Sequence, residues 1–448
     1  DTYRVLMAVD AVVMVIDAAK GIESQTRKLF EICRMRGIPI FTFMNKLDRP
    51  SLNALALIDE LEEMLDLRVC AMNWPLGDGP DFQGVYDRQT RQAHFFERMD
   101  HGAYRSPVAL HAITDHQVRD RLPANIYEPL IDELDVLDSV GEVFDLDAVR
   151  AGALSPVFFG SAINNFGVQL MLDQILDYAP PPQSRLSGAT PIAPSNPAFS
   201  GFIFKIQSNM DPRHRDQIAF MRICSGCFTR DMRVTHSRTG EQVRLSSSHR
   251  IFSRDRETVD TAFPGDVIGL VGHSEFGIGD TLTEDPSIVY DEMPQFAPEC
   301  FSTLHNPAPS EYKRFQAGVK HLLQEGALQS FRFADAAQNV PLLGAVGVLQ
   351  FEVFKYRLEN EYGAVARLET APYTMIRWVD ESEGGEAVVA EAMLPHGCRV
   401  AMDAHERKVI LFHSKWSLNF FAQQKPKVRL LELPASIKRA PSETGAVA

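Results

Sequence analysis

Short apolar runs alternate with segments of helical spacing in the first part of the chain. The runs Ala11–Ile16, Ile38–Met44 and Ser155–Phe159 are rich in β-branched and aromatic residues, which is typical of strands buried on both faces of a parallel sheet. Apolar residues recur at helical spacing over Ser24–Met35 and Leu52–Leu65. This alternation predicts an α/β domain.

Polar residues follow the second of these runs directly. Asn45, Lys46 and Asp48 give the spacing N-K-x-D, and ligands of open α/β sheets bind beyond the carboxyl ends of the strands. A carboxylate accepts two parallel hydrogen bonds from the N1 and N2 donors of guanine, a pair that adenine lacks. Asp48 is therefore predicted to select guanine, with Asn45 at the N7 and O6 edge and the Lys46 stem over the purine face.

The third run ends in small residues at Gly160, Ser161 and Ala162, and Gly167–Ala179 follows with helical spacing. Backbone N–H groups in such a turn can approach a ligand closely. In a guanine site of this type, the Ala162 N–H contacts guanine O6 and Ser161 braces the loop that carries Asp48. Taken alone, the same residues fit an ordinary strand-to-helix turn.

The pattern changes after residue 180. A stretch with Pro180–Pro182 and further prolines at 191, 194 and 197 lacks hydrophobic periodicity, which is typical of a semi-rigid linker. Short strands with Gly turns then predict a small antiparallel barrel. These strands are Phe202–Gln207, Ile218–Ser225, Arg233–His236, Gln242–Leu245 and Val267–Val271.

The next unit reads β-α-β-β-α-β, the order of a ferredoxin-like split βαβ fold. Its predicted elements are Cys300–His305, Ser310–Glu325 with Ser310 as N-cap, Leu328–Phe333, Pro341–Val346, Gly347–Tyr362 and Ala364–Glu369. Phe351, Phe354 and Tyr356 lie at helical spacing, which favours core positions over a platform for stacking RNA bases.

Composition narrows the classes of protein that fit. The chain has 448 residues and a formal net charge of −14, which argues against loose wrapping of nucleic acid but leaves room for local basic patches. No apolar stretch reaches membrane-spanning length and no signal peptide is evident, so a cytoplasmic protein with no membrane partner is expected. The six cysteines show no disulfide framework.

Two further groups have alternative interpretations. Cys224 and Cys227 form a C-x-x-C pair that suits a Ser-Gly turn better than a zinc site or a redox pair, although His214, His236 and His249 are conceivable extra ligands. The basic Arg213-His214-Arg215 cluster fits a solvated turn, or a contact with RNA or with a switch segment.

The motifs together resemble a known family. Asp10–Thr26, Asn45–Arg49 and Gly160–Ala162 look like the second half of a translational GTPase domain. The following segments resemble the bacterial peptide chain release factor 3 family over nearly the whole chain: Phe199–Asp216, Phe220–Gly226, Pro264–Gly269 and Gly344–Phe351. The Asn209–Arg215 stretch argues against an initiation-type factor, and the domain count argues against an elongation-type translocase.

The resemblance implies a domain plan and a function. The plan is a partial α/β P-loop-type GTP-binding domain (1–180), a Pro-rich linker (181–197), a translational-factor-type β-barrel (198–292), a ferredoxin-like α+β domain (293–430) and a flexible C-terminal tail (431–448). The implied function is a translation-termination GTPase that uses GTP and GDP to recycle class I peptide chain release factors from the ribosome. Such a factor is expected to be a monomer that contacts ribosomal RNA and proteins.

The phosphate half of the nucleotide site is missing from this sequence. No G-x-x-x-x-G-K-[ST] segment occurs, and the family's first switch and its D-x-P-G-H segment are expected upstream of Asp1. We therefore expect an N-terminally truncated, inactive chain, with no catalytic residue or metal ligand of its own and Mg²⁺ bound only with the missing part. The alternatives are a non-catalytic ribosome-binding paralogue or fragment, and an elongation-factor-type GTPase.

Overall fold

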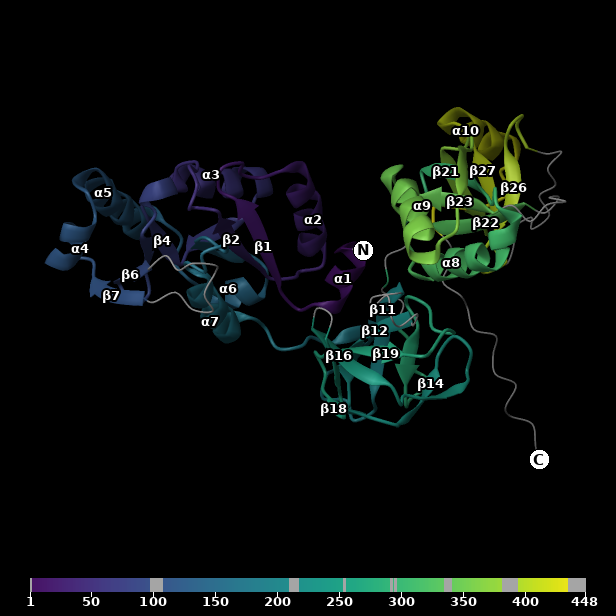
Figure 1. Ribbon diagram of the computed structural model, residues 1–448, viewed down its shortest axis with the longest axis horizontal. Coiled ribbons are helices and arrows are strands. Elements are labelled where there is room, and N and C mark those ends of the chain that lie inside the picture. The colour runs from purple at the N-terminus through teal and green to yellow at the C-terminus, as the bar shows by residue number, and fades with distance from the viewer. Residues whose placement is uncertain are drawn as a thin grey trace. The chain divides into compact units, whose positions relative to one another are not determined.

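The computed structural model describes residues 2–96, 108–208, 217–252, 255–290, 293, 296–333, 341–380 and 394–433. They form two compact units (Figure 1). One unit is residues 9–183, and the other joins residues 2–8 to the described residues from 184 onward. The predicted Asn209–Arg215 stretch, with its basic cluster, lies outside the described residues.

A four-stranded parallel sheet forms the centre of the unit of residues 9–183. Its strands, in spatial order, are β1 (Val12–Asp17), β2 (Ile40–Asn45), β8 (Leu154–Phe159) and β3 (Arg68–Ala71). All neighbouring pairs are parallel, so the carboxyl ends of β2 and β8 lie side by side. Every β2 side chain before Asn45 is buried, which confirms the predicted strand.

Helices pack on this sheet as the hydrophobic spacing predicts. They are α2 (Ser24–Met35), α3 (Ala54–Leu65), α6 (Leu146–Arg150) and α7 (Val168–Tyr178). Phe41, Phe43 and Phe158 of the sheet share one apolar core with Met171 of α7. The Asn53 side chain caps α3 by accepting from the N–H groups of two residues in its first turn.

An antiparallel meander with two helices extends this unit. It consists of β4 (Asn73–Leu76), β5 (Gly84–Asp87), β6 (Gln92–Phe96), β7 (Val108–Ala112), α4 (His116–Arg121) and α5 (Ala124–Val140), with a 3₁₀ turn η2 (Gly79–Asp81). The fully buried Trp74 donates its indole N–H to Glu133 of α5 at 2.8 Å. This hydrogen bond holds α5 against β4.

The barrel is built on a longer set of strands than the sequence predicts. An eight-stranded sheet has the order β15-β14-β20-β11-β12-β19-β16-β17. Its strands are β11 (Ser200–Ser208), β12 (Gln217–Ser225), β14 (Arg233–His236), β15 (Gln242–Arg244), β16 (Ser248–Phe252), β17 (Asp255–Thr258), β19 (Val267–Val271) and β20 (Thr281–Thr283). A small pair, β13 (Phe228–Thr229) and β18 (Thr261–Ala262), completes it. Phe199, Met221 and Phe228 are among the residues of its core.

The Pro-rich stretch before the barrel contains regular structure, contrary to the sequence interpretation. β9 (Arg185–Ser187) and β10 (Thr190–Ile192) form a two-stranded hairpin. Ile192 is buried against the barrel with Phe202 and Tyr290. Pro191 fits because a two-stranded ribbon leaves one edge of each strand without a hydrogen-bonded neighbour.

The chain start packs on the barrel. α1 (Thr2–Val5) continues into the 3₁₀ turn η1 (Leu6–Ala8). Met7 and Ala8 are buried in the same cluster as Phe202 and Phe204. Both elements therefore belong with the barrel, whereas the sheet that follows them belongs to the other unit.

The first half of the C-terminal domain has the predicted β-α-β-β-α-β order. Its elements are β21 (Cys300–His305), α8 (Tyr312–Gln324), β22 (Gln329–Phe333), β23 (Leu342–Ala345), α9 (Leu349–Tyr362) and β24 (Arg367–Thr370), and a 3₁₀ turn η3 (Pro309–Glu311) precedes α8. The antiparallel order β24-β21-β23-β22 is that of a split βαβ fold. Ser310 lies inside η3 and does not cap α8, whose N-cap is Glu311.

The sheet continues beyond the predicted fold. β25 (Met375–Val379), β26 (Arg399–Asp403), β27 (Lys408–Phe412) and β28 (Leu430–Leu431) extend it to eight strands, and α10 (Lys415–Gln424) packs against β27. Phe301 and Phe331 share a core with Trp378 and Leu411, so strands from both halves of the sheet contribute to one core. Residues 410–430, which the domain plan includes in this domain, thus lie in its sheet and in α10. Leu431, predicted as the first residue of the flexible tail, lies in β28 instead, and residues 434–448 lie outside the described residues.

Helix α9 corrects one core prediction. Phe351 and Phe354 are buried as expected, but Tyr356 is 67% exposed. All three are aromatic, and spacing alone cannot assign each to a face when a helix carries apolar residues on both sides. Tyr356 is a surface residue.

A buried carboxylate joins the barrel to the C-terminal domain within their common unit. Glu325, at the end of α8, accepts the Ser208 N–H of β11 at 2.9 Å and is paired with the Arg357 guanidinium of α9. Its own backbone carbonyl accepts from Arg4 of α1 at 2.9 Å. Three elements therefore meet at one residue that is 8% exposed.

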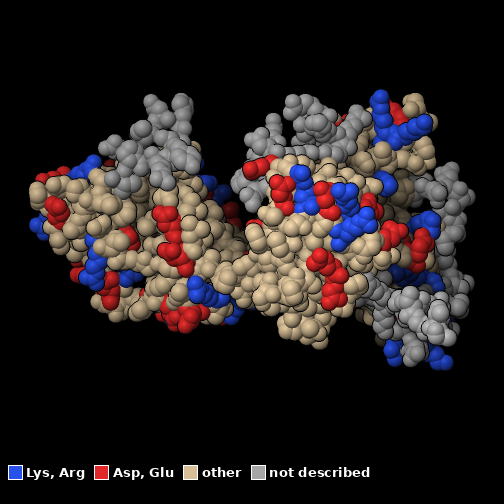
Figure 2. Space-filling view, turned by 90° about the horizontal axis from the view of Figure 1, so that it is seen from below, with Lys and Arg blue, Asp and Glu red and all other residues tan. Residues whose placement is uncertain are grey.

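The surface carries both signs of charge. On the face drawn in Figure 2, Lys and Arg side chains lie among Asp and Glu side chains. With a formal net charge of −14, any surface of this chain that binds nucleic acid has to be a local one.

Candidate guanine-nucleotide site

The predicted base-reading residues come together where β2 and β8 end. The Gly160 N–H donates to the Met44 carbonyl at 3.0 Å, and the Leu47 N–H donates to the Gly160 carbonyl at 3.2 Å. These bonds tie the N-K-x-D loop to the Gly-Ser-Ala turn. Lys46 adopts the left-handed conformation with φ 72°, which turns the chain sharply between Asn45 and Leu47.

Asn45 organises the two loops through one oxygen. Its Oδ1 accepts the Lys46 N–H at 2.8 Å and the Ala162 N–H at 2.9 Å. The side-chain amide N–H₂ is therefore the group left to face a ligand. The contact of the Ala162 N–H with guanine O6 stays a prediction, because this N–H is used by Asn45 here.

Ser161 lies beneath Asp48. Its hydroxyl donates to Asp48 Oδ1 at 2.5 Å and accepts from the Asn164 side chain at 3.1 Å. Ser161 is fully buried, and its N–H donates to the Phe166 carbonyl at 2.9 Å. A buried hydroxyl that makes two hydrogen bonds fixes the direction in which the Asp48 carboxylate points.

One residue of this cluster is not found by the sequence interpretation. Asp17, the last residue of β1, accepts from the Lys46 ammonium at 2.7 Å and from the Ala19 N–H at 3.1 Å. The hydrogen bond from Lys46 holds the pKa of Asp17 below its usual value. This pair holds the lysine stem along the edge where the strands end.

The pair gives a pH-dependent stability. Because the pKa of Asp17 is lowered on folding, the stabilisation is complete above its unfolded value near 3.8 and is lost as the pH falls below it. With the Lys46 side chain 45% exposed, screening limits the contribution to at most about 1 kcal/mol. We expect Lys46→Met to lower the unfolding free energy at pH 6, and the difference from the parent chain to shrink as the pH falls below 3.8.

Urea unfolding of both chains at several pH values checks this. Lys28→Met is the matched control, because Lys28 is an exposed lysine of α2 and is not among the charges that act on the pKa of Asp17. A difference between Lys46→Met and the parent chain that grows on acidification contradicts the assignment.

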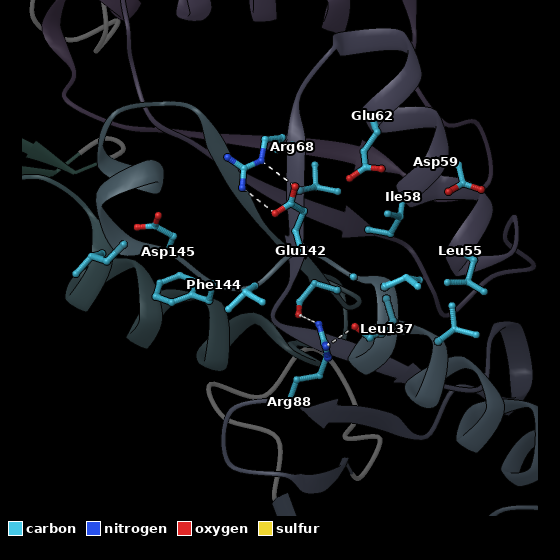
Figure 3. Close-up of a pocket in the computed structure, with 17 residues that line it drawn as sticks. Leu55, Ile58, Asp59, Glu62, Arg68, Arg88, Leu137, Glu142, Phe144 and Asp145 are labelled. Carbon is cyan, nitrogen blue, oxygen red and sulfur yellow. Dashed lines mark hydrogen bonds and ion pairs between the residues drawn. The ribbon is translucent and has the colours of Figure 1, made fainter.

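A separate groove lies between α3, β3 and α5 (Figure 3). Arg68 makes two hydrogen bonds to Glu142, at 2.8 and 2.7 Å, and Arg88 donates to the carbonyls of Ala71 and Leu137. The guanidinium groups of both arginines in this groove are thus hydrogen-bonded to other groups of the protein. None of the predicted site residues lines this groove.

The remaining candidates do not form a metal site in the part of the chain that the structure describes. Cys224 is buried and Cys227 exposed, both as free thiols, and no cluster of metal-ligating side chains is present among these residues. His236 is fully buried, with its Nε2 2.7 Å from Asp280. None of the described helices has the length and apolar character needed to cross a membrane.

Comparison with known proteins assigns the chain. Three family models match successive parts: the Elongation factor Tu GTP binding domain over residues 1–181, Elongation factor G domain 2 over 198–285, and the C-terminal domain of class II release factor RF3 over 290–422. A peptide chain release factor 3 from Synechococcus elongatus is 48% identical over 99% of this chain and 79% of its own length. The chain belongs to the peptide chain release factor 3 family. Its members are translation-termination GTPases, which supports termination over the elongation-type alternative.

Other relatives agree. The peptide chain release factor 3 of Trichormus variabilis is 46% identical over 96% of this chain and 79% of its own length. A crystal structure of a protein from Thermus thermophilus matches with a TM-score of 0.63 at 21% identity, covering 86% of this chain and 58% of that one. That likeness concerns the fold. Family membership and the GTP-binding domain imply guanine-nucleotide binding and GTP hydrolysis by the family, and action on the ribosome.

Proposed function

We propose that this chain carries the guanine-reading part of a class II release factor, which uses GTP and GDP to recycle class I peptide chain release factors from the ribosome. The observation that carries the proposal is the Asp48 carboxylate, held by buried Ser161 where β2 and β8 end. Ligands of open α/β sheets bind beyond the carboxyl ends of the strands, and this supports Asp48 as the guanine selector.

Each site residue has a defined task in this proposal. Asp48 accepts from guanine N1 and N2, which excludes adenine. Asn45 offers its amide N–H₂ to the purine edge, because Oδ1 is held by the Lys46 and Ala162 N–H groups. Lys46 lays its alkyl stem on the purine face, while its ammonium stays with Asp17.

Hydrolysis is assigned to groups other than these. No G-x-x-x-x-G-K-[ST] segment occurs in residues 1–448, and such a segment supplies the phosphate-binding N–H groups, the lysine and a Mg²⁺ ligand in P-loop enzymes. We assign Mg²⁺ to the phosphate half of the site, because in P-loop enzymes it is held by the P-loop Ser/Thr, a Walker-B Asp and the phosphates rather than by the groups that contact the base. We therefore assign no metal-dependent step to this chain.

We expect residues 1–448 alone to bind guanine nucleotides weakly and without a preference between GTP and GDP. Base contacts alone distinguish guanine from adenine but do not distinguish GTP from GDP, so both are expected to bind equally, without hydrolysis above background. Isothermal calorimetry measures the affinities for GTP and GDP, and an assay of phosphate release measures hydrolysis. Submicromolar GTP binding, or a clear preference between GTP and GDP, contradicts this division of the site.

The proposed partners are the ribosome and class I release factors, met by a cytoplasmic monomer. The alternative is a non-catalytic ribosome-binding protein, and the family match supports the recycling factor over it. One measurement distinguishes the two proposed functions. A recycling factor supplied with a P-loop segment accelerates departure of a class I factor only with GTP, whereas a non-catalytic binder occupies the ribosome regardless of nucleotide.

A further inference from the structure

A stretch near the end of the C-terminal domain differs in charge from the rest of the chain. Residues 407–431 contain six Lys or Arg and no Asp or Glu, where the composition of the chain gives about three acidic residues in that length. The stretch forms β27, α10 and β28. Figure 1 shows α10 on the outside of the eight-stranded sheet.

The carboxylates that flank this stretch are already neutralised. Glu406 is paired with Arg332 at 2.9 Å, and Glu432 with Arg377 at 3.0 Å. Within the described part of the chain, Lys415 has no carboxylate partner. Its positive charge is therefore available to a ligand.

Two aromatic rings are exposed on the same helix. Trp416 is 68% and Phe420 41% exposed, and their rings stack with centroids 5.2 Å apart and an interplanar angle of 16°. The opposite side of α10 is anchored, since Ser417 and Phe421 are buried and Ser414 with Ser417 forms a capping box. The rings are therefore held on a rigid helix rather than on a loop.

The polar neighbours of these rings suit nucleobases. Asn419 and Gln423 are exposed and follow Trp416 at helical spacings of three and seven residues, so they lie along one side of α10. The exposed Lys427 follows just beyond the end of the helix. Amide side chains donate to and accept from base edges. We name the set Lys415, Trp416, Asn419, Phe420, Gln423 and Lys427 the α10 surface.

We propose that the α10 surface binds single-stranded RNA. Unpaired bases stack on exposed aromatic rings, and lysines beside them contact phosphates. The chemistry favours RNA over an apolar protein partner, because the exposed rings lie within an acid-free basic stretch. The exposed Tyr356 on α9 is the contrasting case, since its helix also carries Glu352 and Glu359.

The proposal is independent of the nucleotide site and of the proposed recycling function, so its test needs neither GTP nor a ribosome. Of the three tryptophans, Trp74 and Trp378 are buried and Trp416 is exposed. An unstructured 12-nucleotide RNA titrated into the whole chain is expected to quench the exposed tryptophan emission, and a duplex of equal charge to leave it unchanged.

Variants test whether RNA binds at the α10 surface. By anisotropy with labelled RNA, the Trp416→Ala/Phe420→Ala double variant is expected to bind tenfold or more weakly, since each base–ring stack contributes substantially. Trp416→Phe keeps a ring and should bind within about threefold of the parent chain. Lys427→Gln should lower the slope of log affinity against log salt by about 0.7. Tyr356→Ala is the matched exposed-aromatic control, expected to change nothing.

Three results overturn the proposal. They are parent-like RNA affinity in the Trp416→Ala/Phe420→Ala variant, equal loss in Tyr356→Ala, and equal binding of duplex and single strand. A photoreactive side chain at position 423 adds an independent arm on ribosomes. Cross-links to RNA support the α10 surface as an RNA site, and cross-links to protein alone contradict it.

Discussion

Asp48→Asn is expected to weaken guanine-nucleotide binding by roughly 2–4 kcal/mol, because it replaces one acceptor by a donor that faces the guanine N–H groups. The Ser161 hydroxyl can still donate to the remaining oxygen, so the loop should keep its shape. Xanthine carries a carbonyl oxygen at C2 and can accept from the new amide. The variant should therefore prefer xanthine nucleotides.

Both dissociation constants are measured by titration in a fusion that supplies a P-loop segment from a family member. Asp66→Asn is a suitable control, because Asp66 has a side chain 86% exposed and a left-handed conformation that asparagine tolerates. Unchanged guanine affinity in Asp48→Asn removes this residue from the site.

Glu325→Ala is expected to loosen the junction of the barrel and the C-terminal domain. It leaves the Ser208 N–H of β11 without its acceptor and takes one carboxylate from the Arg357 guanidinium. Breaking a buried ion pair costs about 3–5 kcal/mol. Amide hydrogen exchange in β11 and α8 should accelerate by roughly two orders of magnitude or more.

Glu361→Gln provides the matched control for this change. Glu361 pairs with the same arginine at 2.6 Å, but its side chain is 31% exposed and it lies one helical turn away on α9. Such a pair contributes about 0.3–0.5 kcal/mol. Equal acceleration of exchange in the two variants contradicts a special role for Glu325.

The spacing of hydrophobic residues predicted those helices and strands that bury one continuous apolar face. α2 and β14 were predicted to the residue, and the split βαβ order followed from alternating strand and helix spacings. The cluster at the ends of β2 and β8 was also foreseeable, because parallel strands place their carboxyl ends together.

Features that depend on non-local pairing were not foreseeable. The Asp17–Lys46 ion pair joins residues 29 positions apart, and nothing in the spacing of either residue indicates it. Asp17 ends a predicted strand, so a search for charged residues at all strand ends was the available signal.

Two other misses have local causes. The hairpin at Arg185–Ile192 has strands of only three residues, too short for a hydrophobic alternation to stand out. The exposure of Tyr356 was not predicted because α9 has apolar residues on both faces. Burial is inferred from a contrast between an apolar and a polar face, and α9 lacks that contrast.

We propose that Asp48 selects the nucleotide that drives class I factor recycling. The most direct test of this proposal is the departure rate of a fluorescent class I factor from termination complexes, using the P-loop fusion with and without Asp48→Asn. We expect acceleration by the parent fusion with GTP, and acceleration by the Asp48→Asn fusion with XTP but not with GTP. Equal acceleration of both fusions by GTP would contradict it.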